Sequence, residues 1–173
     1  MDWHTREAGV EDVDRLALIG AATFLETFAG ILDGGAIVEH CRAEHSAAAY
    51  LRYLESGATA WLAEAAEGAA PIGFALLGSS SLPGTDPDGG DLELKRIYSL
   101  SHFHGKGVGV ALMGLALEHA TEAAARRLLL GVYAGNARAL AFYRKQGFAP
   151  IGGRRFQVGA REYDDIVLAK PLR

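Results

Sequence analysis

A glycine-rich stretch in the middle of the chain carries residue types that bind phosphate groups. Residues 102–113 read HFHGKGVGVALM, with glycines at 105, 107 and 109 and a lysine at 106. Glycine permits conformations in which successive backbone N–H groups turn toward one point. The helix predicted to follow would aim its first N–H groups at the same point. The pattern predicts a pyrophosphate site that needs no metal; a tight turn without a ligand is the alternative.

Two common phosphate-binding motifs do not fit this stretch. A Walker loop ends in Gly-Lys-Ser/Thr, whereas Lys106 is followed by Gly107 and Val108. The dinucleotide motif G-x-G-x-x-G requires glycine where this chain has Val110 or Leu112, depending on the register. Both motifs are therefore disfavoured, which leaves a pyrophosphate site of another kind or a tight turn without a ligand.

The flanking segments predict one mixed α/β domain over residues 1–173. Strands are expected at residues 2–8, 58–66, 71–78, 91–100, 126–134, 148–157 and 163–170. Helices are expected at 10–28, 34–45, 46–57, from the glycine loop to about 125, and at 136–147, with Asn136 as N-cap and Gly147 as the stop. The apolar run at 126–134 predicts a strand buried on both faces, as in a parallel pair. Residues 78–90 predict a mobile surface insertion.

Two motifs together resemble the GNAT superfamily of acetyl-CoA-dependent N-acetyltransferases. Residues 93–112, ELKRIYSLSHFHGKGVGVAL, are similar to its strand, bulge, [Q/R]-x-x-G-x-[G/A] loop and helix, except that His104 stands where Gln or Arg is usual. Residues 136–148, NARALAFYRKQGF, resemble its second motif at Asn136, Ala139, Tyr143, Gly147 and Phe148. Shorter similarities at 23–28 and 156–172 resemble the bacterial spermidine/spermine N-acetyltransferase branch.

The resemblance implies a fold and a co-substrate. The fold would be a single GNAT-like domain whose mixed, mostly antiparallel central sheet has helices on both faces and a parallel strand pair splayed around the cofactor. Acetyl-CoA would be the co-substrate. The residues that the resemblance assigns to its pantetheine arm and phosphates are Ile97, Tyr98, Ser99, His104, Gly105, Lys106, Gly107, Val108, Gly109, Asn136, Tyr143 and Lys145.

Acetyl transfer to an amine needs a base and an acid. A primary amine has a pKa of ~10.4 and is mostly protonated at neutral pH. The resemblance assigns the base to Glu93, eleven residues before His104, and the acid to Tyr143. Alternatively, Glu93 is a carboxylate paired with Lys95 or Arg96, and the proton leaves through water.

Other acidic and aromatic residues are candidates for the acceptor side. Asp91 and Glu26 are substitute bases, and either could instead hold a cationic substrate. We expect Glu26 and Phe28 to bind the acceptor, and the EYDD segment at 162–165 would favour a polycation if it lay nearby. His104 would donate more strongly to phosphate when protonated, so acetyl-CoA affinity is expected to weaken above pH ~6.5.

Composition excludes several classes of partner. The formal net charge of −4 gives no support to nucleic-acid or anionic-membrane binding. A single cysteine, Cys41, excludes an internal disulfide and a cysteine-built zinc site, and the histidines lie at no metal-ligand spacing. No signal peptide or apolar span is recognisable, which predicts a cytoplasmic protein. The family resemblance implies a homodimer.

The predicted function is transfer of an acetyl group from acetyl-CoA to a primary amine of a polyamine or another small molecule. A protein or peptide N-acetyltransferase is one alternative. A non-catalytic acetyl-CoA-binding sensor or interaction module is another, although Glu93 and Tyr143 argue against it. An unrelated nucleotide-binding protein is a third.

Overall fold

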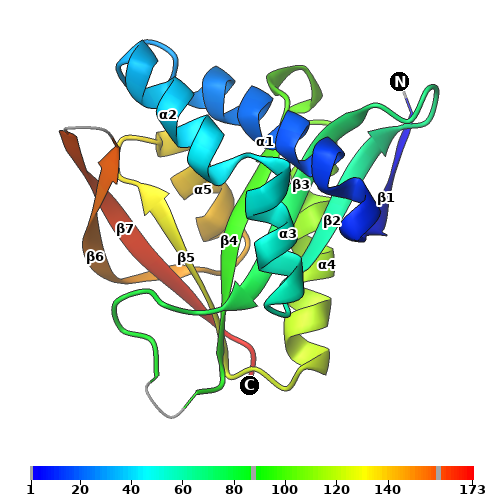
Figure 1. The fold of residues 1–173 in the computed structure, drawn as a ribbon. Coiled ribbons are helices and arrows are strands. Elements are labelled where there is room, and N and C mark those ends of the chain that lie inside the picture. The colour runs from blue at the N-terminus through cyan, green and yellow to red at the C-terminus, as the bar shows by residue number, and fades with distance from the viewer. Residues whose placement is uncertain (1, 87–88, 159–160) are drawn as a thin grey trace.

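The computed structural model describes residues 2–86, 89–158 and 161–173 (Figure 1). Its strands are β1 (Trp3–Ala8), β2 (Thr59–Ala65), β3 (Pro71–Ser79), β4 (Asp91–Ser99), β5 (Arg127–Tyr133), β6 (Ala149–Val158) and β7 (Arg161–Pro171). Its α-helices are α1 (Val13–Phe28), α2 (Gly34–Glu44), α3 (Ala47–Glu55), α4 (Val108–Glu122) and α5 (Ala137–Lys145), with short 3-10 turns η1 (Val10–Asp12) and η2 (Ser101–Phe103). The predicted elements are therefore confirmed, apart from small differences at their ends.

The described residues form a seven-stranded sheet in the order β1-β2-β3-β4-β5-β7-β6. Neighbouring strands are antiparallel except β4 and β5, which run parallel and pair over Asp91–Glu93 and Arg127–Leu129. Beyond these residues the two strands separate (Figure 1). The expected mixed sheet with a splayed parallel pair is confirmed. Residues 126–134 were predicted to form a buried strand in a parallel pair. The strand is largely buried, but its parallel pairing with β4 covers only Arg127–Leu129, whereas its antiparallel pairing with β7 covers its whole length.

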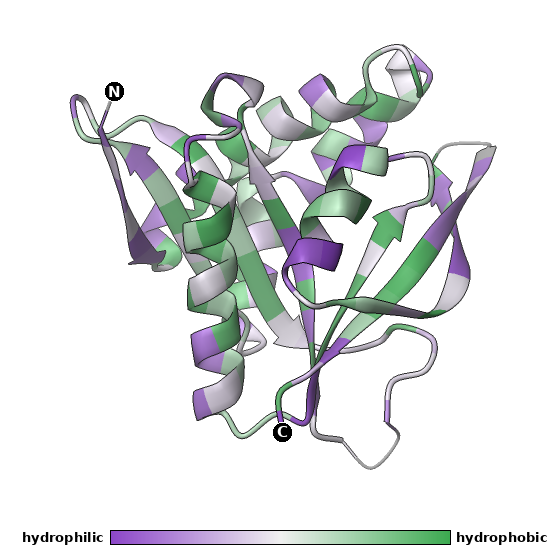
Figure 2. Ribbon diagram, turned by 180° about the vertical axis from the view of Figure 1, so that it is seen from behind, coloured by the Kyte–Doolittle hydropathy of each residue, from purple (hydrophilic) through white to green (hydrophobic). Residues whose placement is uncertain are grey.

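Helices cover both faces of the sheet, as Figures 1 and 2 show from opposite sides. On the first face, α1 and α3 place Leu16, Ile19 and Tyr50 in a core against β2 and β3. On the second face, Val108 and Leu112 of α4 are fully buried against the sheet. Their spacing gives each helix one apolar side, which explains why the sheet is covered twice.

A β-bulge at Lys95 changes which face each residue of β4 occupies. Leu77 of β3 lies opposite Leu94, and the preceding residue of β3 lies opposite Arg96, so Lys95 is an extra residue. Leu94 faces the α4 core, whereas the Arg96 guanidinium lies 5.4 Å from the Tyr50 ring on the first face. Simple alternation therefore ends at Leu94, and the bulge brings Arg96 to the first face.

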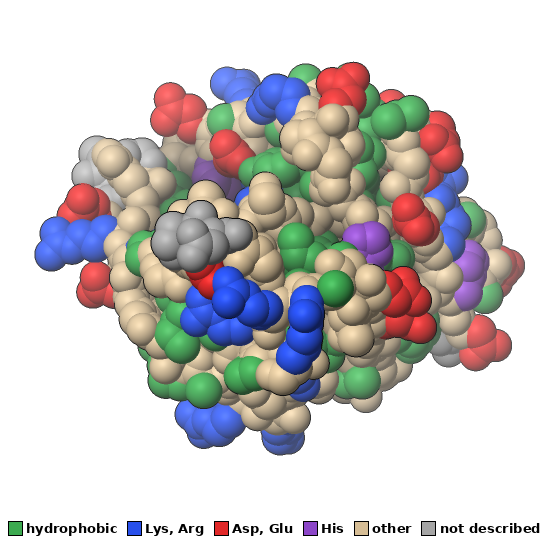
Figure 3. Space-filling view, turned by 90° about the horizontal axis from the view of Figure 1, so that it is seen from below, with side chains coloured by type: hydrophobic (Ala, Val, Ile, Leu, Met, Phe, Trp, Pro, Cys, Tyr) green, Lys and Arg blue, Asp and Glu red, His purple; other side chains and the backbone are tan. Residues whose placement is uncertain are grey.

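The insertion before β4 is packed onto the sheet where the structure describes it. Leu82 is buried against Leu129 and Val167, so this part does not stand away from the domain as a free surface loop. At the same end, Arg127 pairs with the fully buried Asp91 side chain at 2.5 Å, and Arg126 pairs with Asp86. Figure 3 shows Lys and Arg side chains gathered at this end, where a hollow of about 610 Å³ lies between the insertion and β5. These ion pairs fasten the insertion.

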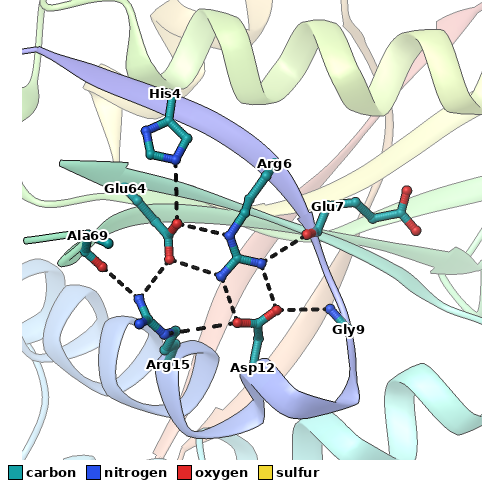
Figure 4. Close-up of polar contacts among 8 residues, drawn as sticks. All are labelled: His4, Arg6, Glu7, Gly9, Asp12, Arg15, Glu64 and Ala69. Carbon is teal, nitrogen blue, oxygen red and sulfur yellow. Dashed lines mark hydrogen bonds and ion pairs between the residues drawn. The ribbon is translucent and has the colours of Figure 1, made fainter. Parts of the chain in front are cut away.

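A charged network fastens the N-terminal strand (Figure 4). Arg6 of β1 donates to both oxygens of Asp12 at 2.7 Å and to both oxygens of Glu64 at 2.9 and 3.0 Å. Arg15 of α1 adds a hydrogen bond of 2.8 Å to Glu64. The hydrogen bonds from Arg6 lower the pKa of both carboxyl groups. The network ties β1, β2 and α1 together.

Candidate active site

The gap between β4 and β5 is the centre of the candidate site. Past Glu93, β4 is paired with β3 on one side and has no β5 neighbour among the described residues on the other. The unpaired edge includes Ile97, Tyr98 and Ser99; the Ile97 side chain packs in the core under α4, and the Tyr98 side chain packs in the core on the opposite face. An open strand edge offers main-chain groups to an extended ligand. The site predicted for the pantetheine arm is thus geometrically available.

The glycine loop lies at the end of β4 and begins α4. Gly105 and Gly107 have φ of +75° and +88°, in the left-handed region that glycine adopts readily. Gly107 is the N-cap of α4 and no side chain caps this helix, whereas side chains cap α2, α3 and α5. The first N–H groups of α4 therefore remain available to an anion. Val108 contributes only backbone here, because its side chain is fully buried.

His104 is held by two neighbours at this loop. Its Nε2 lies 2.9 Å from the Ser99 carbonyl oxygen, which can only accept, so Nε2 carries the proton. Arg138 of α5 then donates to Nδ1. Burial lowers the pKa of His104, with the Arg138 charge adding to the effect. The imidazole is therefore protonated at lower pH than the free side chain assumed in the prediction.

Arg138 is a residue that the sequence analysis missed. It is exposed, and it brings a guanidinium from the first turn of α5 to the loop where the family pattern has Gln or Arg. The predicted Lys145 is also exposed, but it lies seven residues further along α5, or about 10 Å along the helix axis. Lys106 extends over the Phe103 ring at 5.2 Å. The structure thus brings Arg138, and not Lys145, to His104.

Helix α5 places Tyr143 and Asn136. The Asn136 side chain accepts from the Ala139 N–H at 3.0 Å, which confirms the predicted N-cap. Gly147, at φ +87°, ends the helix as predicted. The Tyr143 ring packs against Phe148, while its hydroxyl forms no hydrogen bond with any described residue. Burial raises the pKa of Tyr143, and the neighbouring Tyr98 adds to the effect, so the phenol stays protonated.

Glu93 is buried at the point where the two strands part. Its Oε2 accepts from the Ser81 N–H at 3.1 Å and from Lys95 Nζ at 3.3 Å. The pairing with Lys95 is the one that the sequence analysis named as the alternative to a base. Oε1 accepts no hydrogen bond from the described residues, so the carboxylate keeps one oxygen for a further partner.

The other predicted acceptor residues are distributed differently. Glu26 accepts from the Ser101 N–H and Oγ at 2.9 and 3.0 Å, and so ties α1 to the end of β4. Asp91 is occupied by Arg127. Phe28 stacks near Phe24, with ring centroids 4.5 Å apart, and faces Tyr133 at 6.4 Å. Phe28 therefore lies at the aromatic wall between α1 and β5, and Glu26 at the loop side.

A second charged pair, which was also not predicted from the sequence, lies on the first face of the sheet. Arg154 Nε of β6 donates to Asp165 Oδ2 of β7 at 3.1 Å. Asp165 is buried, and burial raises the pKa of its carboxyl group even though Arg154 opposes the shift. The acidic EYDD segment thus supplies Asp165, but not as a free negative charge.

No group of His, Cys, Asp and Glu that could hold a metal ion occurs among the described residues. In the same part of the chain, no helix is long and apolar enough to cross a membrane.

Comparison with known proteins identifies the family of this chain. The acetyltransferase (GNAT) family matches residues 23–148, which include the glycine loop and all of α5. An uncharacterized N-acetyltransferase of Mycobacterium tuberculosis is 34% identical over 161 residues, covering 93% of this chain and 98% of that protein. A Mycobacterium bovis protein of the same description matches to the same extent.

Solved structures share the whole fold. The PaiA N-acetyltransferase of Thermoplasma acidophilum, in complex with coenzyme A, superimposes with a TM-score of 0.80 at 22% identity over 99% of both chains. A ribosomal-protein-alanine N-acetyltransferase of Brucella melitensis gives 0.69 at 23% identity, over 97% of this chain and 99% of that one. The chain belongs to the acetyltransferase (GNAT) family. It is an acetyl-CoA-dependent N-acetyltransferase with acetyl-CoA as co-substrate.

Proposed function

We propose that the acceptor is the primary amine of a small molecule and that the reaction takes place where β4 and β5 part. The observation that carries this proposal is Tyr143, a buried residue of α5 that lies near Tyr98 of β4 and whose hydroxyl forms no hydrogen bond with any described residue. A phenol in that state is a proton donor without a structural partner. The finer assignment to polyamines rests only on short sequence similarities.

The two sides of acetyl-CoA have separate binding groups in this proposal. The N–H groups of Gly105, Gly107 and Gly109 hold the pyrophosphate, with Lys106 at the rim. Arg138 adds the guanidinium that His104 lacks, and Lys145 reaches more distant phosphate. The edge of β4 and Asn136 hold the pantetheine arm from opposite sides.

In the reaction, the amine nitrogen attacks the thioester carbonyl carbon. A C–N bond forms, the C–S bond breaks, and the amine loses a proton. Glu93 takes that proton, directly or through one water, at its free oxygen. Tyr143 donates its proton to the departing thiolate, whose thiol has a pKa of ~8.5, and main-chain N–H groups on the β4 edge stabilise the oxyanion.

Incubation with acetyl-CoA and a panel of small amines tests the proposal, read by thiol release and by the acetyl mass added to the amine. Glu93→Gln should lower kcat/KM about 100-fold at pH 7 and change its dependence on pH. Glu67→Gln, an exposed carboxylate in the β2–β3 turn, is the control and should leave the profile unchanged.

The outcomes separate the alternatives. Coenzyme A binding without turnover of any amine would support a sensor and contradict the proposal. Acetylation of peptide N-termini, with small amines inert, would replace the acceptor class. An unchanged profile in Glu93→Gln would remove Glu93 as the base while leaving the acetyltransferase reaction intact.

A further inference from the structure

The Arg154–Asp165 pair lies at the vertex of the splayed strands, on the face away from α4. Glu93 and Leu129 form the last described β4–β5 pair, and Gly131 is the next residue of β5 on the same face. The Arg154 guanidinium lies directly over Gly131, because a Cβ there would be 2.9 Å from Nη2. The glycine therefore lets a positive group lie flat against β5 where the gap opens.

The guanidinium is fixed in place but not saturated. Nε donates to Asp165, whose side chain is 7% exposed, and Cζ lies 5.4 Å from the centroid of the Phe156 ring. The two terminal nitrogens donate to no described residue, and a hollow of about 390 Å³ adjoins the pair. A guanidinium with two free parallel N–H groups matches a carboxylate in geometry and charge.

The other charged groups around the vertex are already paired. Lys95 pairs with Glu93, and Glu44 pairs with Arg96. These two carboxylates therefore present no uncompensated charge to a polycation, while the terminal nitrogens of Arg154 have no partner among the described residues.

Aromatic side chains form the wall beside this pair. Phe28 faces Tyr133 at 6.4 Å, and Tyr133 meets Tyr163 at 6.0 Å between ring centroids. These rings offer apolar contact area on the same side as the free guanidinium. The acceptor that matches this surface has an apolar body and one negative group.

We propose that the acceptor of this enzyme carries a carboxylate next to its amine, as a free amino acid does, and that Arg154 binds that carboxylate. The inference rests on the proposed small-molecule amine acceptor. The carboxylate on Arg154 anchors the molecule at the vertex, and its amine then faces the thioester in the gap. Gly131 is a specificity position, since any side chain there displaces the guanidinium.

Acceptors with the same skeleton test the proposal: phenylalanine, phenylalaninamide and phenethylamine, with spermidine as the polycation. The wild-type enzyme should favour phenylalanine over phenylalaninamide by about 10-fold or more in kcat/KM. Arg154→Gln should abolish that preference by slowing phenylalanine alone. A merely structural role would lower kcat/KM equally for both acceptors.

Two further variants keep the test decisive if Arg154→Gln folds poorly. Gly131→Ala keeps the charge of Arg154 but crowds its guanidinium, with Nε 3.2 Å from the added Cβ, and should reduce the preference. Arg52→Gln removes an exposed arginine of α3 and should leave the preference unchanged.

The results distinguish two failures. If no amine is acetylated, the proposed function fails and this inference falls with it. If amines are acetylated but phenylalanine and its amide react equally, or if spermidine is preferred, the carboxylate inference alone is overturned.

Discussion

The N-terminal ion network and the β4–β5 vertex both hold charged groups against the sheet, but they differ in how many hydrogen bonds remain to be made. In the network, Arg6 and Arg15 engage every oxygen of Asp12 and Glu64. At the vertex, the terminal nitrogens of Arg154 lack described partners, as does the Tyr143 hydroxyl on the α4 side of the sheet. A saturated cluster stabilises the fold, whereas an unsaturated one is organised to receive a ligand.

The largest expected effect comes from breaking the saturated cluster. Arg6→Met leaves two buried carboxylates without their shared partner and should lower the unfolding free energy by about 3 kcal/mol at pH 7. The KM for acetyl-CoA should not change. Urea denaturation measures the first quantity and steady-state kinetics the second.

The pH dependence sharpens this prediction. Because Arg6 lowers the pKa of Asp12 and Glu64, their contribution to stability is present above their unfolded pKa values near 4 and is lost as pH falls through the folded values. In Arg6→Met, the unfolding free energy should therefore fall much less on acidification than it does in the wild type. Arg155→Gln, in an exposed ion pair, should cost at most about 1 kcal/mol. Equal losses in the two variants would contradict the distinction.

Tyr143→Phe should have the opposite effect to Arg6→Met: activity should fall, and stability should be retained. We expect kcat to fall about 100-fold because the general acid is lost, with KM for acetyl-CoA within about 2-fold of wild type. Stability should change little, since the hydroxyl has no described partner to lose. Tyr53→Phe, beside Arg96 on the other face, is the matched control. A raised KM with normal kcat would show that Tyr143 binds and does not donate.

The smallest effect is expected at the glycine loop. Arg138→Gln should raise the KM for acetyl-CoA about 10-fold with little change in kcat, because a charge-assisted contact to phosphate is removed. Lys145→Gln should have a smaller effect, and Arg144→Gln, exposed on the same helix, should have none. A Lys145 effect larger than that of Arg138 would overturn the assignment made from the His104 contact.

Local patterns predicted the elements, because helix caps and apolar periodicity act over a few residues. Asn136 and Gly147 bound α5 as expected, and the glycine loop precedes α4. The family motifs, once seen, also predicted the splayed parallel pair, which periodicity alone would not.

Contacts between distant segments were not predictable in this way. Arg138 meets His104 across 34 positions, and Arg154 covers Gly131 only because β6 and β7 fold back beside β5. An arginine in a helix or an edge strand is usually a solvated side chain, so neither residue had a distinguishing signal. The Lys95 bulge escaped for a related reason, since alternation at 92–95 reads the same with or without it.

That bulge acts on β4 as a frameshift acts on a reading frame. Every residue after Lys95 has its face set by the count of residues before it, so a single deletion there would exchange the two sets of side chains as far as Ser99. Arg96 and Tyr98 would turn toward α4, and Ile97 would turn toward the core formed with α1 and α3. In this strand, the presence of an extra residue at position 95 decides which side chains reach each face of the sheet, whichever amino acid occupies that position.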